Sequence, residues 1–96
     1  MILRWTRPAL RDLSEIFDFL AARNPVAAQK ILSGIRTRAN LLPHHPMMGR
    51  SGRIDGTREL VIGKTPFVIA YRVTSTHVDI LAVRHDHRQW PDKLAD

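Results

Sequence analysis

The Asn24-Pro25 pair divides the first half of the chain into two segments with helical patterns and leaves almost no linker between them. Asn is a preferred residue at a helix N-cap, and proline at the first helical position loses no hydrogen bond. Two helices joined so closely must run antiparallel. The chain is therefore constrained to contain a helical hairpin, and its two apolar stripes need a common surface to cover them.

Each predicted helix has its own start signal and its own apolar stripe. The first helix follows Thr6, a good N-cap, with Pro8 in its first turn. Its apolar residues are Leu13, Ile16, Phe17 and Leu20, at the i, i+3, i+4, i+7 spacing of one buried face. The second stripe comprises Ala28, Ile31, Leu32, Ile35, Ala39 and Leu42, and Pro43 ends it. Within it, Gly34 either marks a close helix approach or is simply tolerated.

The rest of the chain has the pattern of β-strands. A short run at residues 2–5 precedes the first helix, and residues 43–56 predict an irregular loop. Three β-branched or aromatic segments follow, namely Thr57–Ile62, Phe67–Val73 and Val78–Arg84. The short links between them indicate antiparallel hairpins.

The middle of these segments predicts the centre of the sheet. Phe67, Ile69, Tyr71 and Val73 share one face, and Val68 and Ala70 lie on the other. Tyr71 is therefore interpreted as a core residue. The expected fold class is α+β in the order β-α-α-β-β-β, as one domain over residues 1–96. The helical hairpin packs on one face of a small, mostly antiparallel sheet, whose other face stays partly open.

The charge points to an acidic partner. The chain has fifteen Lys and Arg residues and nine Asp and Glu residues, which gives a net charge of +6, and most of the basic residues are arginines. Such a chain suits nucleic acid or an acidic protein segment. The absence of cysteine, of a signal peptide and of a long apolar run leads us to expect a cytoplasmic protein without a membrane span. The histidines lack metal-ligand spacing, so we expect no metal and no cofactor.

The order and spacing of several short segments resemble the RelE/ParE toxin superfamily across essentially the whole chain. These segments are Asn24–Ala28, His45–Arg50, Gly56–Leu60, Pro66–Val73, Ile80–His85 and Arg88–Pro91. The resemblance implies the toxin of a type II toxin–antitoxin pair, neutralised by an antitoxin whose acidic or amphipathic C-terminal segment wraps it. Members of this superfamily either bind DNA gyrase, as ParE-like toxins do, or cleave mRNA on the ribosome, as RelE-like toxins do.

The residues match the pattern of the RelE-like nucleases only in part. Arg58 stands for one basic residue of the second strand, but Leu60 replaces the next. Val68 occupies the position where the resemblance implies an arginine, and no tyrosine follows the last strand.

The candidate catalytic residues that the nuclease alternative retains are His85, His87, Arg58 and Arg72. In an extended segment His85 and His87 share a face, and Asp86 points away from both. Solvated basic residues at the end of the last strand are the alternative interpretation.

A binding function requires less from the sequence. Arg and Trp dominate interface hot spots. The candidate target-binding residues are Arg84, His85, Arg88 and Trp90, with Arg50 and Arg53 on the preceding loop. Trp90 is alternatively a C-terminal anchor against the sheet. We favour a ParE-like inhibitor that binds gyrase without chemistry of its own. The alternatives are a ribosome-dependent mRNA endonuclease and a member that has lost toxicity and only binds.

Overall fold

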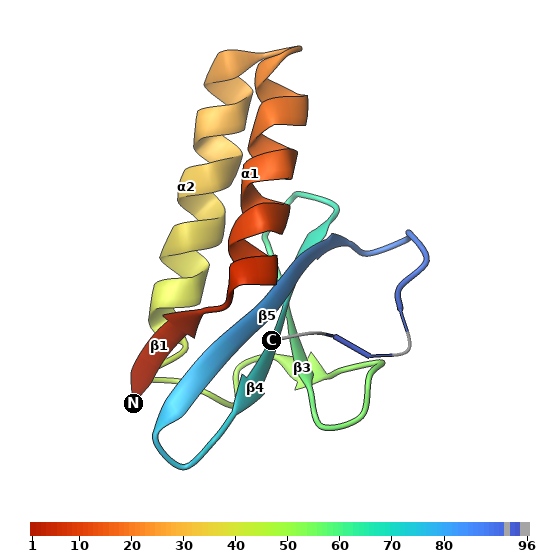
Figure 1. The fold of residues 1–96 in the computed structure, drawn as a ribbon. Helices are drawn as coiled ribbons and strands as arrows, with labels where there is room; N and C mark the ends of the chain where they lie inside the picture. The colour runs from red at the N-terminus through yellow and green to blue at the C-terminus, as the bar shows by residue number, and fades with distance from the viewer. Residues whose placement is uncertain (92, 95–96) are drawn as a thin grey trace.

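Two helices cover one side of a five-stranded sheet in the computed structural model, which describes residues 1–91 and 93–94 (Figure 1). The elements are β1 (Ile2–Trp5), α1 (Arg7–Ala21), α2 (Pro25–Leu41), β2 (Arg50–Ser51), β3 (Arg58–Val61), β4 (Phe67–Val73) and β5 (His77–His85). The strand order is β1-β5-β4-β3-β2. Only β1 and β5 are parallel, so the predicted α+β fold with a mostly antiparallel sheet is confirmed.

The predicted helix starts are also confirmed. The Thr6 hydroxyl accepts a hydrogen bond from the Ala9 N–H at 3.4 Å, and the Asn24 side chain accepts one from the Ala27 N–H at 3.1 Å. A proline occupies the first turn of each helix. The helices run side by side as a hairpin (Figure 1). Among the described residues, no helix is both long and apolar enough to cross a membrane.

One strand was missed by the sequence pattern. The segment predicted as an irregular loop, residues 43–56, contains the two-residue strand β2. Arg50 and Ser51 pair with Glu59 and Arg58 of β3. Two residues are too few to display an alternating pattern, so only the pairing with β3 defines this strand.

The core lies between the helical hairpin and one face of the sheet. The helices contribute Ala9, Leu13, Ile35 and Ala39, the strands contribute Leu60, Ile69, Tyr71, Val78, Ile80 and Val83, and Leu42 and Ile62 join them from just after α2 and β3. β4 is the central strand, as predicted, and Val68 and Ala70 on its other face are buried too. The opposite face is open at its margins, where Ile2 and Val61 are exposed.

Tyr71 is fully buried, which confirms its interpretation as a core residue. Its hydroxyl donates a hydrogen bond to the Pro46 carbonyl at 2.7 Å and accepts one from the Gly49 N–H at 2.9 Å. Tyr71 therefore ties the loop before β2 to the centre of the sheet.

The first turns of α1 are fixed to β5 by polar side chains. The Thr6 hydroxyl donates to the Ile80 carbonyl at 2.7 Å, and the Asp12 carboxylate accepts from the Val83 N–H at 3.1 Å. The register of β1 reaches only Ile80, so Asp12 occupies an edge position of β5 that no strand covers. Burial raises the pKa of Asp12, and the bond from Val83 and the charge of Arg84 oppose that rise.

Replacing Gly34 with alanine should stabilise the fold. A Cβ atom built at Gly34 meets nothing within 4 Å, so Gly34→Ala adds no clash inside α2. Alanine is favoured over glycine in a helix interior by about 0.8–1 kcal/mol. We expect the melting temperature, followed by circular dichroism, to rise by about 4–8 °C. Gly56→Ala is the contrast, because Gly56 has a φ of 77° and a side chain there is strained. Equal shifts in the two variants would contradict this account.

Removing the Tyr71 hydroxyl should destabilise the fold, while the aromatic ring stays packed in the core. Tyr71→Phe leaves the buried Gly49 N–H without its partner, a loss of about 1–3 kcal/mol. Urea unfolding should give a lower midpoint with an unchanged slope. Thr76→Val, which alters an exposed hydroxyl, is the control. An unchanged midpoint for Tyr71→Phe would show that the hydroxyl is dispensable for stability.

Candidate functional site

A buried carboxylate organises the sheet face opposite the helices. Glu59 lies on β3, where its register partners are Ala70 of β4 and Arg50 of β2. Tyr71, the next residue of β4, packs under the helices, so Glu59 and Ala70 face the other way. The Glu59 residue is only 2% exposed. A charge this buried must be paired and hydrogen-bonded to be tolerated.

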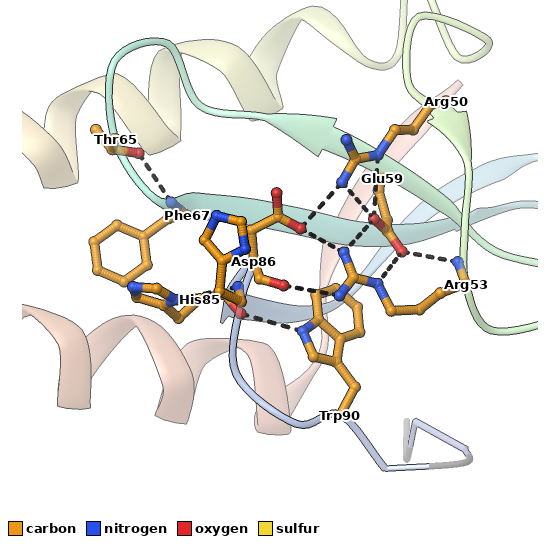
Figure 2. A network of polar contacts seen from close by, with 9 residues as sticks. Arg50, Arg53, Glu59, Thr65, Phe67, His85, Asp86 and Trp90 are labelled. Carbon is orange, nitrogen blue, oxygen red and sulfur yellow. Dashed lines mark hydrogen bonds and ion pairs between the residues drawn. The ribbon is translucent and has the colours of Figure 1, made fainter.

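Two arginines supply the hydrogen bonds to Glu59 (Figure 2). Arg50 donates from Nε and Nη2 to Oε1, at 3.3 and 2.9 Å. Arg53 donates from its backbone N and Nε to Oε2, at 2.8 and 2.9 Å, and from Nη2 to Oε1 at 2.9 Å. The carboxylate is thus enclosed by donors from β2 and from the loop that follows it.

Arg53 extends this network to the segment after β5. Its Nη1 donates to the Asp86 carbonyl at 2.9 Å, and its Nη2 pairs with the Asp86 carboxylate. The guanidinium carbon lies 3.8 Å from the centroid of the Trp90 ring, a cation–π contact. Trp90 in turn donates from Nε1 to the His85 carbonyl at 3.2 Å. Figure 2 shows Arg53 between Glu59 and Trp90, and we call Arg50, Arg53, Glu59, Asp86 and Trp90 the arginine clasp.

The ionisation of the arginine clasp follows from these contacts. Burial disfavours the charged form of Glu59, but hydrogen bonds from Arg53 and Arg50 outweigh it and lower the pKa of Glu59 from 4.5 to about 2. The bond from Arg53 also lowers the pKa of Asp86. Conversely, Glu59 and then Asp86 raise the pKa of Arg53. All of these groups are therefore charged at neutral pH.

A second buried acid lies near the start of β5, at the end of the strand that is away from Asp86. Asp79 is 5% exposed and pairs with Arg4 at 2.8 Å and with Arg72 at 3.3 Å. Hydrogen bonding by Arg4 is the main cause that lowers the pKa of Asp79. Arg72 is thus placed by an internal ion pair.

The candidate catalytic residues do not come together around one point. Arg72 of β4 is in register with Asp79 of β5, and His85 ends β5 six residues after Asp79. At the rise of an extended strand, the backbones of Arg72 and His85 are therefore about 20 Å apart. Arg58 pairs in register with Tyr71, which packs under the helices, and it donates to the Gly49 carbonyl at 2.9 Å. Arg58 and Arg72 therefore start from opposite faces of the sheet.

The two candidate histidines are close to each other. Their ring centroids are 6.1 Å apart, and the His87 N–H donates to His85 Nδ1 at 3.3 Å. The His85 ring also meets the edge of Phe67 at 6.0 Å. Our expectation of an extended segment here was wrong, because β5 ends at His85 and a turn follows. This turn directs Asp86 to the two arginines of the arginine clasp.

The candidate target-binding residues fall into two neighbouring groups. Arg50, Arg53 and Trp90 belong to the arginine clasp, and His85 is joined to it through Trp90. Arg84, His85 and Arg88 line a hollow of about 240 Å³ beside α1, which Asp12, Glu15 and Phe19 complete. Arg84 Nε lies 3.9 Å from the Asp12 carboxylate. Trp90, half buried against Arg53, fits the interpretation of an anchor as well as that of an interface residue.

The acidic members of this site were not predicted from the sequence. Glu59 and Asp86 are the groups that hold the arginines, yet neither was among the candidate residues. The only local signal for Glu59 was its position as a charged residue next to Leu60 in a segment predicted to be a strand. No group of three His, Cys, Asp or Glu side chains in the described part of the chain is placed to hold a metal ion.

Acid should unfold the protein partly through Glu59. Because the pKa of Glu59 is lower in the folded chain than its ordinary value of 4.5, its stabilising contribution is complete above that value. The contribution, about 3 kcal/mol, is lost as the pH falls from about 5 towards 2. Glu59→Gln should lower stability at neutral pH and flatten this dependence in urea unfolding. Asp18→Asn, an exposed change on α1, is the control. A Glu59→Gln curve parallel to that of the wild type would refute the assignment.

The comparisons with known proteins agree on one family. Residues 3–90 match the ParE toxin family of type II toxin-antitoxin systems, parDE. A protein named putative toxin Y4kP from Sinorhizobium fredii is 45% identical over 92 residues, which cover 96% of this chain and 95% of that protein. Toxin RelE2 from Caulobacter vibrioides is 38% identical over 84 residues, covering 88% and 93%.

Solved structures show the same fold. A chain of the chromosomal ParDE toxin–antitoxin system from P. aeruginosa superposes with a TM-score of 0.81 at 30% identity, covering 88% of this chain and 95% of that one. A chain of the toxin-antitoxin complex RelBE2 from Mycobacterium tuberculosis gives a TM-score of 0.64 at 27% identity, with the same coverage. The family match over residues 3–90 includes the arginine clasp and both helices. The chain therefore belongs to the ParE toxin family of type II toxin–antitoxin systems.

Proposed function

We propose that this toxin arrests bacterial growth by binding DNA gyrase, and that a cognate antitoxin neutralises it in the cytoplasm. Membership of the ParE family supports the gyrase target. The P. aeruginosa and M. tuberculosis neighbours are described as a toxin–antitoxin system and a toxin–antitoxin complex, which supports the antitoxin as partner. A net charge of +6 suits an antitoxin with an acidic segment.

The arginine clasp is the observation that favours binding. Arg and Trp are the side chains most often found at interface hot spots. Here Arg53 and Trp90 are stacked on each other, and the buried Glu59 fixes the guanidinium in place. Side chains that are ordered before association lose less conformational entropy when a partner binds. This face therefore offers gyrase a rigid surface of aromatic and cationic groups.

The same geometry gives little support to RNA cleavage. A nuclease of this type needs a base, an acid and phosphate-binding cations around one reacting phosphate. Arg58 and Arg72 start from opposite faces of the sheet. Val68, at the position where the resemblance implies an arginine, is buried.

Two observations favour the endonuclease alternative. The His85 and His87 rings adjoin each other, and two relatives carry the name RelE. We keep a ribosome-dependent mRNA endonuclease as the second candidate for this reason.

Purified toxin should inhibit the supercoiling activity of gyrase. Arg88→Ala, which removes an exposed cation just after the turn that follows β5, should weaken inhibition by about tenfold or more without unfolding the protein. The matched control is Arg11→Ala, an exposed arginine on α1 that is not among the candidate target-binding residues. Inhibition is measured by gel analysis of relaxed plasmid at increasing toxin concentration.

Primer extension on a translated message after toxin induction tests the endonuclease alternative. Intact supercoiling at excess toxin, together with codon-phased cleavage of the message, would overturn the gyrase proposal. Cleavage that disappears in a His85→Ala, His87→Ala double variant would then assign the chemistry to the histidine pair.

A further inference from the structure

The hollow beside α1 has an apolar lining that comes from three elements. Ile16 and Phe19 of α1, Phe67 of β4 and Val83 of β5 line it. Figure 1 shows that α1 extends past the end of β5, so the sheet leaves this side of the helix uncovered. An apolar side chain brought by another molecule would therefore meet apolar groups from both the helix and the sheet.

Phe19 presents an aromatic ring at the surface beside this hollow. The residue is 54% exposed, whereas Leu13 on the same helix is buried in the core. The guanidinium carbon of Arg23 lies 3.8 Å from the centroid of the Phe19 ring, and Arg23 Nη1 donates to the Phe19 carbonyl at 3.0 Å. The ring is thus held in place before a partner arrives, which reduces the entropy lost on association.

Two arginines at the hollow keep donors for an acceptor. Among the described residues, the Arg84 side chain makes one polar contact, the 3.9 Å approach of its Nε to the Asp12 carboxylate, and this buried Nε has no hydrogen-bond partner. Arg88 is exposed and has no ion pair within the described part of the chain. Asp12 also accepts from the Val83 N–H, so Glu15 is the acid of the hollow that stays uncompensated there. A carboxylate brought by a partner would satisfy the two arginines.

We propose that the gyrase-binding surface extends over α1, where the hollow seats an apolar side chain of gyrase and Arg84 and Arg88 bind a gyrase carboxylate next to it. The proposal rests on the proposed function, since it assumes gyrase as the target. Continuity supports this occupant, because His85 lines the hollow and its carbonyl accepts from Trp90 of the arginine clasp. A second copy of this chain fits poorly, because each copy carries a net charge of +6.

Removing the exposed ring should weaken gyrase binding and leave the fold intact. For Phe19→Ala we expect the Kd of the purified toxin for the gyrase holoenzyme, measured by surface plasmon resonance, to rise by about tenfold. Phe19→Tyr keeps the ring and should bind like the wild type. Leu10→Ala, an exposed apolar residue of α1 outside the hollow, is the control and should also bind like the wild type. All three variants should melt close to the wild type, because the altered side chains are exposed.

The sign of the partner's charge has a separate test. Glu15 faces the same hollow and would repel a gyrase carboxylate, so Glu15→Gln should lower the Kd by about two- to fivefold. Asp18→Asn changes the net charge equally on an exposed position of α1 outside the hollow, and it should leave the Kd unchanged. Weaker binding by Glu15→Gln would mean that gyrase presents a cation here, and equal tightening in both variants would mean that only the net charge acts. Either result would overturn the proposal.

The outcomes separate this inference from the proposed function. If the wild type binds gyrase and Phe19→Ala binds it equally well, the assignment of the hollow is wrong and gyrase stands as the target. If the wild type itself does not bind gyrase, the proposed function fails, and this inference fails with it. A wild-type dimer in sedimentation that Phe19→Ala dissociates, with gyrase binding unchanged, would identify a second copy as the occupant and overturn the proposal.

Discussion

The face of the sheet opposite the helices depends on one buried charge. The Glu59 carboxylate receives five hydrogen bonds from two arginines, and without them its burial would oppose folding. Arg50 comes from β2, Arg53 from the following loop, and Asp86 from the turn after β5. Because the arginine clasp joins β2 and the loop after it to β3 and to the turn after β5, it forms only when these segments have come together. The shape of the proposed binding face is thus coupled to global folding.

The sequence predicts those parts of the fold whose signals are local. The N-caps Thr6 and Asn24 and the apolar stripes define both helices, and alternation places β4 at the centre of the sheet. The arginine clasp has no such signal, because its ion pairs join residues 6, 9, 33 and 36 positions apart. Charges that lie on a strand are read as solvent-facing by any periodic pattern, so Glu59 was overlooked. The contacts of Asp86 were not predicted, because the residues after the last strand were treated as an extended segment, whereas a turn follows His85 and brings Asp86 to Arg50 and Arg53.

The arginines of this chain therefore differ in how far internal carboxylates neutralise their charge. Those of the arginine clasp and the pair beside Asp79 are held by internal carboxylates, which fix their geometry and cancel much of their long-range field. Phosphate binding at such positions would have to compete with a buried acid that is already well satisfied. This favours a role in short-range contact with a protein surface over the grip of a reacting phosphate.

The cations on and beside α2 are not held by internal carboxylates. In the described part of the chain no carboxylate lies within ion-pair distance of Lys30, Arg38 or Lys64, so their field extends into solvent. An acidic segment is attracted by such a field before contact, whereas the arginine clasp acts only once a partner has arrived. Salt screens the first interaction much more than the second. The two partners proposed for this toxin would thus be distinguished by charge placement, although both would meet basic side chains.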